Sequence, residues 1–161
     1  MQNRTRNFLI GLTLNEMQSI LAEAGYTHKS PALLAHHVYK KTGKEIHDIH
    51  AYPLKLREYL SARYTSAPAQ PLQSMLSSDG SAKYLFCNHE GLYYETVRMP
   101  EERRETVCIS SQSGCRYGCR FCNTGKTGFL GDLDSYEILS QVSGTGPLPS
   151  HVVFMGMGEP L

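Results

Sequence analysis

The first part of the chain has apolar positions at helical spacing. Thr13 and Glu16 form a capping-box pattern, and the apolar residues after them recur every three or four positions until Gly25. Pro31 follows a serine and Pro53 precedes a leucine, as is typical at the first turn of a helix. The pattern therefore predicts a small domain of three helices over residues 1–65.

The second of these helices is expected to run from Pro31 and to end before Gly43. Lysines and arginines lie on or near the second and third helices. A solvated surface is the simpler interpretation of these charges, and RNA contact is the alternative.

After a segment rich in Pro, Ala and Ser, the hydrophobic period changes from that of a helix to two. Asp79-Gly80 is a hairpin signal, and strand-like patterns follow at 83–87 and 92–99. Residues 66–104 are thus predicted to form a linker and a β-hairpin.

A third pattern covers residues 105–161. It consists of a short apolar strand at 106–110, a glycine-rich loop at 111–131, a helix at 133–142 and a strand at 151–155. The last strand has no polar face after its first residue, as expected of a parallel strand covered on both sides. The fold class expected from the whole chain is α/β, ending in one β–loop–α–β unit.

Composition sets limits on the class of protein. Sixteen Lys and Arg balance 15 Asp and Glu in 161 residues, so bulk charge does not indicate a nucleic-acid binder. No apolar run reaches the roughly 18 residues of a membrane-spanning helix, and the N-terminal apolar stretch is too short for a signal peptide. Five cysteines, four of them clustered, suggest metal or redox chemistry rather than a disulfide framework, and a cytoplasmic location is expected.

The most informative motif is Cys115-x3-Cys119-x2-Cys122. Cubane iron–sulfur clusters usually have four thiolate ligands, so three cysteines leave one iron open. An open coordination site is what a catalytic metal centre needs. At this spacing the open iron can bind S-adenosylmethionine (SAM), and the cluster can cleave it to a radical.

Zinc is the alternative metal that these thiols could bind. The triplet could be a zinc knuckle or, with Cys108, a four-cysteine zinc site. Zinc sites usually consist of two separated cysteine pairs, and the sequence shows no second pair.

Three blocks of the sequence resemble a known family. They are Cys108–Gly125 with Gly128-Phe129 after it, the segment Tyr94–Val97, and Val153–Leu161. They are similar to the dual-specificity radical SAM RNA methyltransferases, which methylate C2 of an adenine in 23S rRNA and in certain tRNAs. Related resistance enzymes, which methylate C8 of the same ribosomal adenine, share these motifs. The resemblance implies the start of a partial (β/α) barrel behind a helical accessory domain that contacts RNA.

The resemblance also assigns cofactor ligands. Cys115, Cys119 and Cys122 correspond to the ligands of a [4Fe–4S] cluster. Gly158 and Glu159 correspond to the residues that contact SAM.

Two further residues acquire roles from the resemblance. Glu95 matches the proton acceptor that removes the C2 proton of adenine. Strand alternation places it with Tyr93, Val97 and Met99, so an apolar environment and a raised pKa are expected. Cys108 matches the resolving cysteine, which forms a disulfide with a methyl-carrying cysteine; from its sequence neighbours alone, a buried inert thiol is the default interpretation.

The methyl-carrying cysteine of the family falls beyond Leu161, and Cys87 matches no family motif. The remaining barrel strands would also lie beyond this point. We therefore expect a truncated or partial form of the enzyme, and the sequence leaves open whether it is active alone. The partners implied are 23S rRNA, tRNA and an electron donor such as flavodoxin or ferredoxin, and the complete enzyme is expected to be a monomer.

Three other functions stay open from the sequence. The chain could be a non-catalytic RNA-binding module with a structural metal, an adenine-C8 rRNA methyltransferase, or a different radical SAM enzyme such as an activase. The Glu95 and Cys108 motifs argue against the last, because radical generation alone requires neither.

Overall fold

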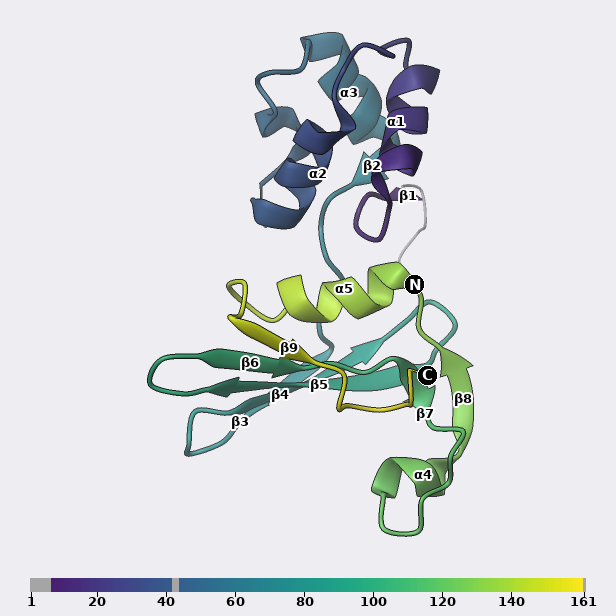
Figure 1. Cartoon of the computed structure of the whole chain (residues 1–161), viewed down its shortest axis with the longest axis vertical. Coiled ribbons are helices and arrows are strands. Elements are labelled where there is room, and N and C mark those ends of the chain that lie inside the picture. The colour runs from purple at the N-terminus through teal and green to yellow at the C-terminus, as the bar shows by residue number, and fades with distance from the viewer. Residues whose placement is uncertain (1–6, 42–43, 161) are drawn as a thin grey trace. The chain divides into compact units, whose positions relative to one another are not determined.

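A computed structural model of the chain describes residues 7–41 and 44–160. Two predictions, the helix stop at Gly43 and the end of the last motif at Leu161, lie outside the described residues. The chain divides into two compact units, one up to Ala67 and one from Pro68 (Figure 1).

The first unit is mainly helical. Its elements are β1 (Asn7–Phe8), α1 (Leu14–Glu23), α2 (Pro31–Lys40), the 3-10 helix η1 (Ile46–Asp48), α3 (Leu54–Arg63) and β2 (Tyr64–Thr65). The short strands β1 and β2 pair in parallel. The prediction of three helices is confirmed, whereas η1 and the two strands were not predicted.

Local sequence explains where α1 begins. The Thr13 backbone N–H donates to the Glu16 carboxylate at 2.7 Å, and the Glu16 N–H donates to Thr13 Oγ1 at 3.3 Å, so both halves of the capping box form. The apolar stripes of the helices meet in a core whose fully buried members include Leu9, Met17, Leu21, Leu34, Tyr52, Leu56 and Leu60.

The second unit is built on a mixed sheet. Its elements are β3 (Gln73–Leu76), β4 (Ala82–Cys87), β5 (Tyr93–Pro100), β6 (Glu105–Cys108), β7 (Gln112–Gly114), α4 (Asn123–Thr127), β8 (Phe129–Asp132), α5 (Ser135–Ser143) and β9 (His151–Val153). Five strands are ordered β3-β4-β5-β6-β9, with β6 and β9 parallel and the other pairs antiparallel. The predicted hairpin and the predicted β–loop–α–β unit thus share one sheet, and the chain is mixed α/β.

Helix α5 covers one face of this sheet (Figure 1). The buried Gln141 amide holds it there: its Oε1 accepts from Thr96 Oγ1 at 2.8 Å and from the Ser110 N–H at 2.7 Å, and its Nε2 donates to the Ser110 carbonyl at 2.9 Å. A single side chain therefore provides hydrogen-bond partners for both the N–H and the carbonyl of Ser110, which lies just after β6.

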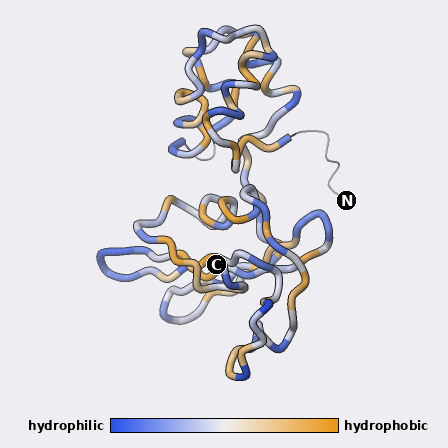
Figure 2. The backbone as a smooth tube through the Cα atoms, turned by 45° about the vertical axis from the view of Figure 1, so that its right-hand side comes forward, coloured by the Kyte–Doolittle hydropathy of each residue, from blue (hydrophilic) through white to orange (hydrophobic). Residues whose placement is uncertain are grey.

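The buried Arg98 joins the same face to the segment after α5. Its guanidinium pairs with Glu105 and donates to Thr145 Oγ1 and to the Pro147 carbonyl. The turn between β5 and β6, by contrast, is strongly hydrophilic (Figure 2), because residues 101–104 are all charged.

Two predictions for this unit need correction. The predicted loop 111–131 contains β7, α4 and the start of β8. The strand predicted at 151–155 ends at Val153, and it is not covered on both sides, because Val152 is 43% exposed. It is also the edge strand of the described sheet. No helix among the described residues is long and apolar enough to cross a membrane.

Candidate functional site

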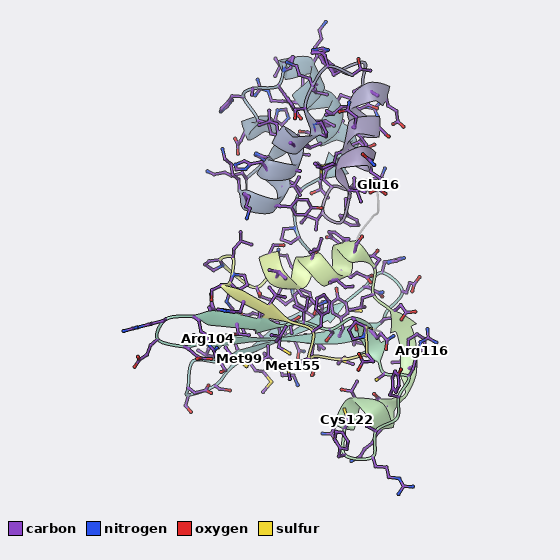
Figure 3. All side chains as sticks on the ribbon, in the orientation of Figure 1. Glu16, Met99, Arg104, Arg116, Cys122 and Met155 are labelled. Atoms are coloured by element: carbon purple, nitrogen blue, oxygen red, sulfur yellow. The ribbon has the colours of Figure 1, made fainter. Side chains whose placement is uncertain are left out.

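The face of the sheet opposite α5 carries two of the predicted site residues. On β5, Tyr94, Thr96 and Arg98 are buried, so the alternate residues, Glu95 among them, project from the other face. Cys108 of β6 pairs directly with Val97 of β5 and therefore shares that face. Figure 3 shows Met99 and Met155 on this side of the sheet, away from α5. We call it the open face.

Glu95 lies on the open face in an ion pair. The Lys83 ammonium is 2.7 Å from its Oε1, and the two side chains are 48% and 40% exposed. The apolar environment predicted for Glu95 is wrong, because the β4–β5 register puts Lys83 opposite Val97, diagonally next to Glu95. Ser110 Oγ donates to the Glu95 carbonyl at 2.6 Å and so fixes the backbone behind the carboxylate.

Cys108 is a free, partly buried thiol. Burial raises its pKa above the ordinary value, and a hydrogen bond with the Met155 backbone opposes this only in part. The thiol is therefore protonated near neutral pH and unreactive until a base or a change of environment deprotonates it.

The cysteine loop begins where β7 ends. The Cys115 N–H donates to the Gly128 carbonyl at 3.0 Å, which closes the neck of the loop. Gly114 has a φ of +74°, and a Cβ there would lie 1.8 Å from the Gly128 oxygen. Only glycine allows the two strands of this neck to come so close.

The other two cysteines lie at the far end of the loop. Cys122 is the N-cap of α4, and its N–H donates to the Cys119 carbonyl at 3.0 Å. A hydrogen bond from the Gly125 N–H lowers the pKa of the Cys122 thiol. Thr124 and Lys126 lower it further, by smaller amounts. A thiol of this kind is readily converted to the thiolate that binds metals.

The donor set of this loop fits a soft metal centre. All three thiols are free, Cys119 is exposed, and Cys115 and Cys122 are partly exposed. Among residues 7–41 and 44–160, however, no three Cys, His, Asp or Glu side chains converge on a point that could hold a metal ion. The structure thus places the three thiols on one tight loop without gathering them at one centre.

The predicted SAM-contacting turn packs against residues 111–112, which lead into the cysteine loop. The Met157 carbonyl accepts from the N–H groups of Ser111, at 2.9 Å, and Gln112, at 3.2 Å. Gly158 has a φ of +98°, and a Cβ there would lie 2.7 Å from Ser111 Oγ, so the turn packs tightly on the chain that leads to Cys115. The Glu159 N–H donates to the side chain of Gln112 at 3.3 Å.

Sequence reasoning missed three residues of this region: Lys83, Gln112 and Gln141. The hairpin register, once counted from the turn at 89–91, would have placed Lys83 near Glu95. No local signal reveals the long-range roles of Gln112 and Gln141, because the partners that join them to other elements lie between 20 and 47 positions away.

No protein-family model matches the chain. It is 39% identical over 158 residues to a probable dual-specificity RNA methyltransferase RlmN of Bacteroides fragilis, an alignment that covers 95% of this chain and 45% of the relative. A protein of the same name from a Picosynechococcus species is 38% identical over 160 residues, covering 97% and 46%.

A solved structure is also similar. The crystal structure of a radical SAM methyltransferase from Sphaerobacter thermophilus superposes with a TM-score of 0.81 at 33% identity, over 96% of this chain and 48% of that one. The chain spans slightly less than half the length of the relatives that it matches. Over nearly all of its own length, then, this chain is a homologue of the radical SAM dual-specificity RNA methyltransferases.

Proposed function

We propose that this chain forms the cluster-binding and proton-accepting part of a radical SAM enzyme that methylates an adenine of RNA. The observation that carries the proposal is the common placement of Glu95 and Cys108 on the open face of a sheet whose other face α5 occupies. In this proposal the face under α5 stabilises the fold and the open face carries the reacting side chains. The substrate base would approach the open face.

In this proposal Cys115, Cys119 and Cys122 hold a [4Fe–4S] cluster, and Gly158 and Glu159 hold the methionine end of SAM. A cluster bound there would supply the electron that cleaves SAM to a 5′-deoxyadenosyl radical. The N–H groups around Cys122 favour its thiolate and so favour metal loading.

Glu95 would accept the proton from C2 of the adenine. The ion pair with Lys83 holds its carboxylate on the open face, and the 40% exposure leaves room for a substrate to reach it. Cys108, two strand positions away on the neighbouring strand, would act as the resolving cysteine towards a methyl-carrying cysteine that residues 1–161 do not supply.

The substrate class would be RNA, the class that the name of the relatives gives. Within that class, the sequence motifs that resemble the family favour an adenine of 23S rRNA and of tRNA. An electron carrier such as flavodoxin or ferredoxin would supply the electron. The start of a partial (β/α) barrel, with β6, α5 and β9 as its first β–α–β unit, is the fold that goes with this proposal.

Anaerobic reconstitution with iron and sulfide tests the proposal. We expect about three to four irons per chain, a [4Fe–4S]⁺ electron paramagnetic resonance signal after reduction, and a change in that signal on addition of SAM. The matched control is Cys87→Ser, which removes a cysteine outside the loop and should leave the signal intact, whereas Cys119→Ser should abolish it. Stoichiometric zinc without any response to SAM would refute the enzyme and favour an RNA-binding module with a structural metal.

A further inference from the structure

Gln112 is buried between the turn at 156–160 and strand β8, and both ends of its amide are used. Its Oε1 accepts from the Glu159 N–H at 3.3 Å, and its Nε2 donates to Asp132 Oδ1 at 2.8 Å. Its own backbone N–H donates to the Met157 carbonyl at 3.2 Å. The residue is only 7% exposed, so its amide has little access to water as a substitute partner.

The contacts continue from Asp132 to the cysteine loop. Asp132 Oδ2 pairs with the Arg116 guanidinium at 3.0 Å, and that guanidinium lies 3.5 Å from the centre of the Phe129 ring. Arg116 directly follows Cys115, and Phe129 directly follows Gly128 at the neck. One continuous series of contacts therefore joins the backbone of Glu159 to both strands of the loop neck.

The chemistry of this position suits glutamine. One end must accept a hydrogen bond from a backbone N–H, and the other must donate one to a carboxylate. A leucine would remove the acceptor of the Glu159 N–H and the donor to Asp132 Oδ1, and a glutamate would place a second carboxylate against Asp132.

We propose that Gln112 is a positioning residue that couples the cysteine loop to the turn of Gly158 and Glu159. Occupation of the loop by a metal centre then orders the turn, so that the SAM-contacting residues are set in place once the cluster is present. The role in SAM binding rests on the proposed function, whereas the mechanical coupling does not.

Hydrogen–deuterium exchange with mass spectrometry tests the coupling on the full chain. The variants are Gln112→Leu, Gln112→Glu and, as a control, Gln73→Leu at an exposed glutamine of β3 in the five-stranded sheet. Without metal, we expect Gln112→Leu to speed exchange about fivefold both in the turn 156–160 and at the neck 114–116, and the β4 peptide 82–87 to stay unchanged. A merely structural role would instead speed exchange throughout the sheet.

Metal loading supplies the second readout. Iron and sulfide, or zinc alone as a probe, should slow exchange in the turn of the unsubstituted chain and of Gln73→Leu. Gln112→Leu should bind as much metal and lose this response. Gln112→Glu should also lose this response, because its carboxylate would face the carboxylate of Asp132 in place of a donor N–H.

The outcomes separate this inference from the proposed function. A turn protected by zinc only through Gln112, with no response to SAM, would leave the coupling standing and refute the enzyme. Faster exchange at the turn alone, or metal-induced protection that survives Gln112→Leu, would overturn the coupling. If the chain takes up no metal, the exchange rates of the metal-free variants at the turn and at the neck decide whether the two are coupled.

Discussion

Lys83 pairs with Glu95 on one face of β5, at 2.7 Å, while Arg98 pairs with Glu105 on the other face. The first pair is about half exposed, whereas the Arg98 side chain is only 6% exposed. Strand β5 thus contributes to one ion pair that is open to solvent and to one that holds the fold together.

The two pairs should differ in their effect on stability. Lys83→Met should change the free energy of unfolding by less than about 1 kcal/mol, because exposed ion pairs contribute little. Arg98→Met should lower it by about 3 kcal/mol, because it leaves Glu105, Thr145 and the Pro147 carbonyl without their common donor. Urea denaturation of the two variants measures both values, and equal losses would contradict the division between the faces.

The neck of the cysteine loop should not tolerate a methyl group. Gly114→Ala would push a Cβ into the Gly128 carbonyl, so we expect a loss of more than about 3 kcal/mol and little bound iron. Gly118→Ala is the matched control: its φ is also positive, at +53°, but no atom lies within 4 Å of the added Cβ. It should cost about 1 kcal/mol and keep iron binding. Iron retained by Gly114→Ala would show that the neck is not required.

The cysteines should differ in reactivity. At pH 7 iodoacetamide should label Cys122 before Cys108, because neighbouring N–H groups lower the pKa of the first thiol and burial raises that of the second. Peptide mapping of samples quenched at successive times gives the order. Faster labelling of Cys108 would mean that the open face exposes its thiol far more than the structure shows.

The helical unit should lose stability in alkali. Burial raises the pKa of Tyr52 to about 12, against 10.0 for the unperturbed group. Because the folded-state pKa is raised, the associated stability is complete below pH 10 and is lost as the pH rises towards 12. Tyr52→Phe should cost about 1 kcal/mol at pH 7, through the lost hydrogen bond to the Ser30 carbonyl, but should show a flatter decline above pH 10. Urea melts followed by helical ellipticity at pH 7, 9 and 11 test this.

Local signals explain which elements could be predicted. The Thr13 cap and the prolines at 31 and 53 act within one helical turn, so the three helices follow from the sequence. The Asp79-Gly80 hairpin signal likewise lies at the turn between β3 and β4, with Gly80 at a φ of +85°, whereas the strand β3 itself was not predicted.

Non-local contacts explain what was missed. Strands β7 and β8 pair across the cysteine loop, and glycine-rich segments of this kind carry no alternating pattern to reveal a strand. The expected environment of Glu95 failed for a related reason: alternation along β5 identifies neighbours on its own strand, whereas the decisive neighbour, Lys83, comes from β4. The predicted roles of Glu95, Cys108, the three loop cysteines, Gly158 and Glu159 stay predictions.

The alternation of β5 also has a use for protein engineering. A library that varies Tyr93 and Val97 would sample new reactivity or new substrates without touching the hydrogen bonds that retain α5. A library at Tyr94 and Thr96 would yield variants that differ in thermal stability, and it would leave the open face unaltered. One eight-residue strand can therefore be diversified in two separate campaigns, each scored by its own assay.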